Sequence, residues 1–323
     1  MALFTIPIAA WLHILSLPQV YLIAATVAGA SALFDIADHA YLPSLIGRAR
    51  IVEANAWLGT TEGAAEMAGP ALAGVLFQWL SASIAVVFNS VTYLVSALFL
   101  SRIRAVEPIG ERPERTGVVS GLAAGTQIIL GNPLARVLLF SSGVGGLFGG
   151  FFNALYILFV LRTLGLGPVV LGLGVACGGL GSLAGAALAP RATRVLGIGL
   201  AIILGSAGSA LGTMILLFAP AHRPGEGVMF LLGQQFVGDF VGVIPLILGT
   251  SLLQSIIAGR ALGRVRSVFQ ATSGLSAVVG ALAGGVLGQV FGVRETLFIA
   301  IGGLLIGPAV GAFTILRHAR TIP

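Results

Sequence analysis

The chain has 323 residues, of which 57% are hydrophobic and only 9% are charged. A soluble domain carries about 25% charged residues, so this composition excludes an ordinary soluble protein. All 17 basic residues are arginine. The lack of lysine excludes the phosphate-binding loop of P-loop ATPases and Schiff-base chemistry, because both need a lysine. The formal net charge of +6 does not indicate a nucleic-acid partner, since the arginines lie in short loops between apolar runs.

Apolar runs of about 20 residues recur along the chain, which is the length that a helix needs to cross a bilayer. The runs are continuous, not alternating, and this pattern favours helices over a barrel. The sequence therefore predicts an all-α membrane protein, a bundle of about ten transmembrane helices. The expected spans are 1–17, 20–40, 52–79, 82–101, 136–161, 167–189, 195–219, 227–253, 267–291 and 294–316.

A long polar loop divides the first four spans from the last six. We therefore expect an incomplete N-terminal transmembrane half at 1–101, a cytoplasmic linker at 102–135 and a complete six-helix C-terminal half at 136–323. Within the linker, Val118 to Leu130 forms either an interfacial amphipathic helix or the start of the next span.

The arginines predict the orientation of the chain. If the ten spans alternate, fourteen of the 17 arginines fall on one side of the membrane, and Arg162, Arg223 and Arg294 fall on the other. Because loops rich in Lys and Arg stay in the cytoplasm, we expect a multi-pass protein with both termini cytoplasmic.

An internal repeat relates two of the spans. Residues 69–80 read GPALAGVLFQWL, and residues 280–291 read GALAGGVLGQVF. Parallel repeats of this kind mark the two halves of one class of secondary transporter; chance similarity between two glycine-rich helices is the alternative. If the third span equals the ninth, each half should hold six helices, so two would be missing before Met1.

Three segments carry a resemblance to the major facilitator superfamily, and within it to the bacterial branch of drug- and siderophore-exporter-like proteins. Residues 34–43, followed by Ala54-Asn55, resemble the branch's FDPAR…A.LP…AN segment at the end of the fourth family helix. Residues 69–74, GPALAG, resemble the antiporter motif on the fifth helix. Residues 263–267, GRVRS, resemble the loop between the tenth and eleventh helices.

The resemblance covers nearly the whole chain and has clear departures. Ile36 replaces the family's usual proline, and Asp38 stands where a basic residue is common. The first two family helices are absent, so Met1 begins where the third would. The resemblance implies alternating access, a small-molecule substrate, a bacterial inner membrane and a monomer.

Acidic residues inside apolar spans are the sharpest functional signals, because a charge at the centre of a membrane helix costs about 3 kcal/mol on insertion scales. Glu62 and Glu66 are four residues apart, hence on one face of a helix. Their shared burial and mutual repulsion favour proton binding, so we expect proton coupling there. The alternative for Glu62 is an interfacial ion pair with an arginine such as Arg48.

Asp239 lies about midway along the eighth span, four residues after Gln235, which ends a pair of glutamines. By the family resemblance this helix lines the substrate cavity, so we expect Asp239 and Gln235 to bind substrate or protons. A structural hydrogen bond to a neighbouring helix is the alternative for Asp239. Asn153 and Tyr156 of the fifth span are weaker candidates for polar contacts in the cavity.

A gate and a hinge complete the expected site. Asp35 lies near the cytoplasmic end of its helix, where we expect a salt bridge to Arg264 or Arg266 that joins the two halves. Gly69-Pro70 removes a backbone hydrogen bond and bends its helix, which suits a hinge; close helix packing through Gly63, Gly69 and Gly74 is compatible with it.

No metal or cofactor is expected. The four histidines are far apart in the sequence, and Cys177 stands alone in an apolar run, which indicates an inert buried thiol. We therefore predict a secondary transporter, with proton-coupled efflux of a small amphipathic molecule. The alternatives are a transport-dead truncated fragment and an intramembrane aspartyl protease, for which Asp35 and Asp239 would be the catalytic pair.

Overall fold

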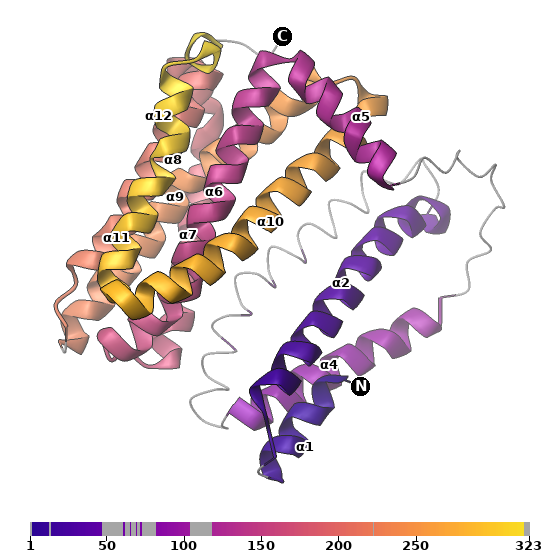
Figure 1. Ribbon diagram of the computed structural model, residues 1–323, viewed down its shortest axis with the longest axis vertical. Helices are drawn as coiled ribbons and strands as arrows, with labels where there is room; N and C mark the ends of the chain where they lie inside the picture. The colour runs from indigo at the N-terminus through magenta and orange to yellow at the C-terminus, as the bar shows by residue number, and fades with distance from the viewer. Residues whose placement is uncertain are drawn as a thin grey trace. The chain divides into compact units, whose positions relative to one another are not determined.

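The computed structural model describes residues 2–12, 14–46, 82–103, 118–221 and 223–319, and the single positions 61, 65, 69 and 72. Regular secondary structure in these described residues is helical throughout (Figure 1). The chain forms two compact units, Met1–Glu114 and Arg115–Pro323.

The first unit contains α1 (Thr5–Trp11), α2 (Leu17–Ile46) and α4 (Ala82–Ser101). Helix α4 matches the expected span 82–101, and α2 contains the expected span 20–40. The structure differs at the expected span 1–17, because α1 has only seven residues and a helix of that length covers about 10 Å, too short to cross hydrocarbon. The expected third span, 52–79, falls almost wholly outside the described residues.

The second unit contains six long helical segments and a shorter helix before them. Its helices are α5 (Val118–Gly131), α6 (Pro133–Leu158), α7 (Pro168–Leu196), α8 (Ile198–Met214), α9 (Pro224–Ile256), α10 (Gly259–Phe291), α11 (Val293–Leu304) and α12 (Ile306–Ala312). A π-helical turn, Phe159–Thr163, continues α6. Helix α5 is separate from α6, so the linker segment forms its own helix and not the start of the next span.

Local sequence signals fix the ends of these helices. Asn132 caps α6, since its side-chain oxygen accepts hydrogen bonds from the backbone N–H groups of Leu134 at 3.0 Å and Ala135 at 3.2 Å, as N-cap residues do. Gly197 alone separates α7 from α8, and Gly292 alone separates α10 from α11. Their φ angles are 78° and 96°, which only glycine adopts without strain.

Helices that are distant in sequence pair side by side in the second unit. Helix α10 packs along α6, whereas α9 packs between α7 and α8. Helices α11 and α12 pack on α6, and α12 also contacts α8, which joins the two groups (Figure 1). Direct contact between α6 and α9 is slight.

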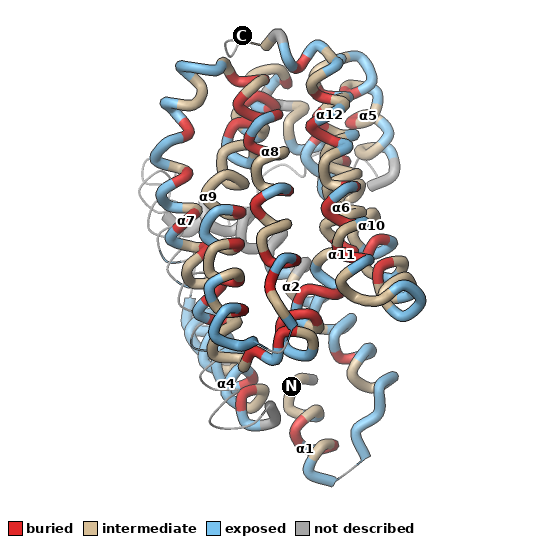
Figure 2. Tube along the Cα trace, turned by 90° about the vertical axis from the view of Figure 1, so that its left-hand side faces the viewer, coloured by how far each residue is buried: buried red, intermediate tan, exposed pale blue. Residues whose placement is uncertain are grey.

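Two hydrophobic clusters form the buried core of the second unit, one at each end of the helices (Figure 2). The first surrounds Leu252 and Val265, and the second surrounds Phe159 and Leu297; all four side chains are fully buried. The middle of the bundle lies between these clusters, and its helices approach each other through glycines. Polar groups in the middle therefore sit between two apolar layers.

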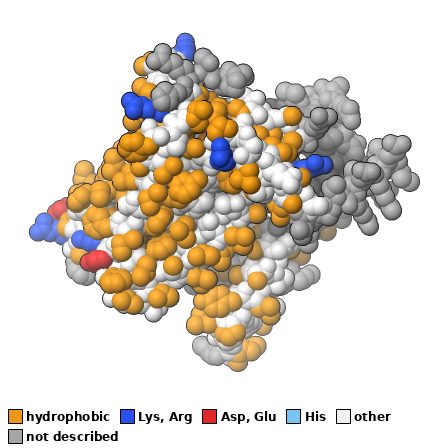
Figure 3. Space-filling model, turned by 45° about the horizontal axis from the view of Figure 1, so that its top comes forward, with side chains coloured by type: hydrophobic (Ala, Val, Ile, Leu, Met, Phe, Trp, Pro, Cys, Tyr) orange, Lys and Arg blue, Asp and Glu red, His pale blue; other side chains and the backbone are white. Residues whose placement is uncertain are grey.

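Seven helical segments among the described residues are long and apolar enough to cross a membrane. Six of them match the six spans expected for 136–323. On the face drawn in Figure 3, hydrophobic side chains cover most of the described surface and charged side chains are few. Exposed large side chains such as Leu183, Met229 and Leu282 suit contact with lipid. The protein is an integral multi-pass membrane protein.

One end of the second unit is held by an arginine. Arg294 Nη2 donates a hydrogen bond of 2.6 Å to the Ala219 carbonyl, and its guanidinium lies 5.4 Å from the centre of the Phe159 ring. We expect Arg294→Gln to destabilise the protein by about 1.5–3 kcal/mol, the usual contribution of a charged hydrogen bond. Arg162→Gln, at an exposed side chain of the same end, is the control, and thermal unfolding in detergent is the measurement. Equal melting temperatures for the two variants would contradict this role of Arg294.

Candidate functional site: an unpaired aspartate and a hydroxyl-lined cavity

Described arginines of the second unit divide between the two ends of its helices. At one end, Arg294 contacts the segment before α9, and Arg223 forms a 3.0 Å ion pair with Glu226; Arg162 lies in the π-helical turn of the same end. The other arginines with described side chains lie at the opposite helix ends: Arg136, Arg191, Arg194, Arg264, Arg266 and Arg317. This grouping agrees with the one expected from the loops.

Asp239 is the acidic residue that lies away from both ends. It stands in the middle of α9, is half-buried, and its carboxylate oxygen Oδ2 lies directly against the backbone of Gly178 in α7. A Cβ atom at position 178 would overlap that oxygen. Within the described residues Asp239 has neither a hydrogen bond nor an ion pair, although a membrane interior makes an unpaired charge expensive.

Glycines of α7 create the space in which this carboxylate sits. Leu231 and Gln235 lie against Gly174, one turn before Asp239 lies against Gly178. Residues four apart share a face of a helix, so Gln235 and Asp239 both face α7. The structure thus brings together two of the predicted site residues.

Two buried polar atoms of the second unit also lack partners among the described residues. They are the hydroxyl of Tyr156 on α6 and the side-chain oxygen Oε1 of Gln234 on α9, whose residues are 9% and 3% exposed. Buried polar atoms almost always have a hydrogen-bond partner, so these two atoms are unusual features of the bundle.

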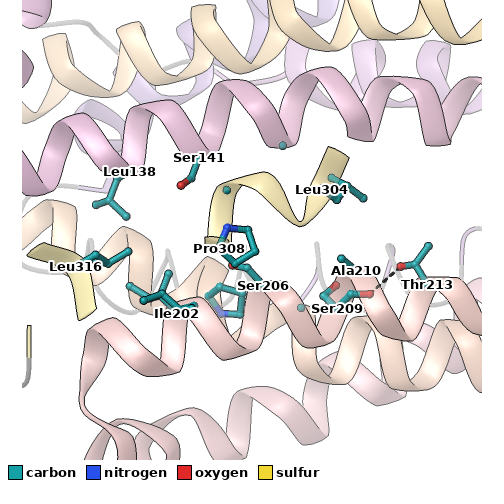
Figure 4. Close-up of a pocket in the computed structure, with 15 residues that line it drawn as sticks. Leu138, Ser141, Ile202, Ser206, Ser209, Ala210, Thr213, Leu304, Pro308 and Leu316 are labelled. Atoms are coloured by element: carbon teal, nitrogen blue, oxygen red, sulfur yellow. Dashed lines mark hydrogen bonds between the residues drawn. The ribbon is translucent and has the colours of Figure 1, made fainter. Parts of the chain in front are cut away.

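A cavity of about 250 Å³ lies between α6, α8, α9 and the last two helices. We call it the interior cavity. Four hydroxyl side chains line it together with aliphatic groups (Figure 4): Ser141, Ser206, Ser209 and Thr213. A mostly apolar hollow with a few polar groups is typical of small-molecule sites.

The hydroxyls of the interior cavity fall into two kinds. Ser209 Oγ donates a hydrogen bond of 3.0 Å to the Gly238 carbonyl, and Thr213 donates one of 2.9 Å to the Ser209 carbonyl. The first bond joins α8 to α9, and the second lies within α8. Ser141 and Ser206 have no partner among the described residues, so their hydroxyls remain available to a bound molecule.

The interior cavity was missed by the sequence reasoning. Ser206, Ser209 and Thr213 are spaced three and four residues apart, which places them on one face of α8. That spacing is visible in the sequence and could have indicated a polar face. Ser141 carries no comparable signal, because it reaches the cavity through the pairing of α6 with the other helices.

Other predicted residues lie apart from this site. Asn153 is exposed on α6 and does not belong to the buried polar group. Arg264 and Arg266 are exposed near the start of α10 and line different hollows, because residues two apart point about 200° away from each other on a helix.

Most of the expected gate, hinge and coupling residues of the first unit lie outside the described residues. Glu62, Glu66 and Pro70 lie outside the described residues, and Asp35 is placed only by the backbone of α2. Gly69 is exposed, and nothing lies within 4 Å of a Cβ built on it. No close packing at Gly69 is therefore seen among the described residues, whereas Gly280, its counterpart in the repeat, packs directly on the Leu147 carbonyl.

Metal-ligand groups are not gathered in the part of the chain that the structure describes, where no three His, Cys, Asp or Glu side chains lie together. Cys177 is partly buried, and its thiol donates a weak 3.8 Å hydrogen bond to the Leu232 carbonyl. The candidate site in the described residues thus consists of the Asp239 carboxylate against α7 and a separate cavity lined by hydroxyl groups.

A multi-pass helical bundle with polar groups at its centre is typical of membrane transporters. The family described as "transmembrane secretion effector", a family of the major facilitator superfamily, matches residues 2–322, and the chain belongs to it. The chain is also similar to the uncharacterized MFS-type transporter YfiS of Bacillus subtilis (strain 168). The two are 25% identical over 321 residues, which cover 94% of this chain and 72% of YfiS.

This match confirms the predicted superfamily. It indicates a transporter and not an enzyme, so the intramembrane aspartyl protease is discarded as an alternative. A small-molecule substrate and a lipid-bilayer environment follow from the same membership.

Proposed function

We propose that the protein exports a small amphipathic molecule by alternating access, driven by proton entry, as in the drug- and siderophore-exporter-like branch. The observation that carries the proposal is the unpaired carboxylate of Asp239 in the middle of α9. A carboxylate in the membrane interior that has no partner among the described residues is favoured in its neutral form, because a charge there is costly. The neutral polar groups of the second unit, including Tyr156 and Gln235, suit a weakly polar substrate better than a sugar.

Proton binding would control which form of the empty carrier can reorient. Moving a bare charge through hydrocarbon is costly, so the empty carrier would return only with its carboxyl groups neutral. In the first unit, Glu66 and Glu62 remain the proposed partners of Asp239 in this role. Asn153 remains a proposed cavity contact.

The gate belongs to the same proposal. A salt bridge from Asp35 to Arg264 or Arg266 would hold the two halves together on the cytoplasmic side while the cavity is open outward. Gly69-Pro70 would provide the hinge, because an internal proline removes a helical hydrogen bond. We further propose a monomer in a bacterial plasma membrane with both termini cytoplasmic.

The orientation is tested by cysteine labelling. In a chain in which Cys177 is replaced by alanine, Val195→Cys should react with an impermeant maleimide only from the cytoplasmic side. Gly225→Cys should react only from outside, since both positions are exposed at opposite helix ends and the arginine-rich end stays inside. Labelling of position 225 in sealed inside-out vesicles alone would reverse the proposed orientation.

The coupling is tested by proton movement in proteoliposomes carrying the protein. Addition of a transported amphiphile, found among cationic, neutral and anionic candidates, should release protons that a pH-sensitive dye reports. Glu66→Gln keeps the shape of the side chain but fixes it neutral, so proton release should be lost while passive exchange of the amphiphile persists. The matched control is Glu226→Gln, which removes an exposed carboxylate paired with Arg223. Unchanged proton release in Glu66→Gln would leave coupling to Asp239 alone.

A further inference from the structure

A second hollow of about 670 Å³ opens beside the interior cavity, between α6, α8, α9 and α10. We call it the arginine cleft, after Arg266 in its wall. Ser141, Ser206 and Pro245 line both the interior cavity and the arginine cleft, so the two hollows adjoin. Their combined space is in the range of small-molecule sites, about 300–1,000 Å³.

Arg266 is the charged residue of the cleft wall, and the cleft holds no acidic side chain among its described residues. Within the described part of the chain, no carboxylate pairs with Arg266, in contrast to Arg223 and Glu226. Arg264 points into a different hollow, between α5 and the segment that joins α9 to α10. The cleft is therefore locally positive and is not neutralised from its own wall.

Polar and apolar groups are unevenly distributed in the cleft. Ser141, Ser142 and Ser206 have hydroxyls with no hydrogen-bond partner among the described residues. Leu138, Ile202, Leu253 and Phe269 provide apolar surface beside them. A molecule that fits this wall needs an acceptor-bearing charged group and an apolar body.

We propose that the arginine cleft binds an amphipathic anion, with its charged group on Arg266 and the free serine hydroxyls, and its apolar body against Leu138, Ile202 and Phe269. A guanidinium binds carboxylate, sulfonate or phosphate oxygens through paired charged hydrogen bonds, which are the strong kind. The proposal specifies the substrate class of the proposed exporter. It rests on the proposed export function only in treating the bound anion as the transported substrate. An anionic lipid headgroup offers the same chemistry.

The probe is octanesulfonate, compared with octyltrimethylammonium and octanol, which share its chain length and differ in charge. Sulfonate does not titrate near neutral pH, so it carries no protons itself. The reporter is Ser142→Cys in a Cys177→Ala chain, reacted with N-ethylmaleimide in nanodiscs of phosphatidylcholine at one pH. Thr250→Cys, on the opposite wall of the cleft, serves if the first variant folds poorly.

Octanesulfonate is expected to slow labelling of the cleft cysteine, whereas the cation and the alcohol leave it unchanged. Arg266→Gln should raise the half-protecting concentration at least about tenfold, equivalent to about 1.4 kcal/mol, and Arg266→Lys, which keeps the charge but loses the paired geometry, should raise it less than Arg266→Gln does. Arg317→Gln, exposed at the same end but outside the cleft, should change nothing. A reporter at Gly225→Cys, at the opposite helix end, should show no protection.

Equal protection by all three amphiphiles, or unchanged protection in Arg266→Gln, would overturn the proposal. Nanodiscs with added phosphatidylglycerol separate the two sources: protection by that lipid alone would assign the cleft to lipid and overturn its assignment to cargo. The assay uses no proton gradient, so it is independent of coupling. If octanesulfonate does not protect the cleft but amphiphiles still release protons, only the substrate class is refuted. If octanesulfonate protects the cleft but no protons are released, only proton coupling is refuted.

Discussion

Asp239→Asn is expected to abolish concentrative transport while the protein remains folded and inserted. Asparagine keeps the size of the side chain that fills the space left by Gly178, but it cannot exchange a proton. A pH difference of one unit stores about 1.4 kcal/mol per proton, enough for about tenfold accumulation. In the variant this accumulation should fall to none, because nothing at the centre of the second unit can couple to the gradient.

The measurement is accumulation of a transported amphiphile in inside-out vesicles with an imposed pH gradient. Glu295→Gln is the matched control, since Glu295 lies in the first turn of α11 at a helix end and its loss should leave accumulation intact. Counterflow without a gradient reports whether binding and reorientation survive. Full accumulation by Asp239→Asn would show that the carboxylate is structural and would move the coupling role to the first unit.

Gly280→Ala is expected to destabilise the second unit strongly. A Cβ at this position would overlap the Leu147 carbonyl of α6, so α10 would have to move away from α6. Overpacking of a tight core costs typically about 1–3 kcal/mol, and a backbone carbonyl cannot move aside as a side chain can. Gly280→Val should abolish folding altogether.

The control for Gly280→Ala lies five residues further along the same helix. A Cβ at Gly285 would meet nothing within 4 Å, so Gly285→Ala should be neutral or slightly stabilising, because alanine is the better helix former by about 1 kcal/mol. Thermal unfolding in detergent and yield in the membrane compare the two variants. A smaller loss for Gly280→Ala than for Gly285→Ala would contradict the tight contact between α6 and α10.

The long helices of the second unit could be predicted from the sequence, because an apolar run of about 20 residues is enough to indicate a membrane-spanning helix. The expected spans did not use the local signals at helix ends, although Asn132-Pro133 and the single glycines at 197 and 292 carry their own backbone chemistry. The expected span 1–17 was wrong as a single crossing helix, because apolar composition does not distinguish one long helix from the short α1 and the following α2.

The candidate site was only partly predictable. Asp239 stood out because a charge in an apolar span is costly wherever its helix packs. By contrast, the free hydroxyls of Ser141 and Ser206 face one cavity only because α6 and α8 meet across it. Which of Arg264 and Arg266 enters the cleft depends on how α10 is rotated, and that rotation is fixed by contacts such as the one at Gly280, not by local sequence.

The glycine contacts described for the second unit also determine how it can deform. Backbone touches backbone between α6 and α10 through Gly146, Gly150 and Gly280, and between α7 and α9 through Gly181 and Gly185. Such contacts leave no flexible side chains between the two helices of a pair. We therefore expect α6 with α10, and α7 with α9, to move as two rigid bodies, each called a slab below.

The second unit should then deform most easily between the two slabs, where α6 and α9 scarcely touch. The interior cavity and the arginine cleft both lie along this boundary. A small change in the angle between the slabs alters the width of both hollows without breaking any helix. Hydrostatic pressure, which favours the loss of internal voids, should therefore act on this seam before it acts on either slab.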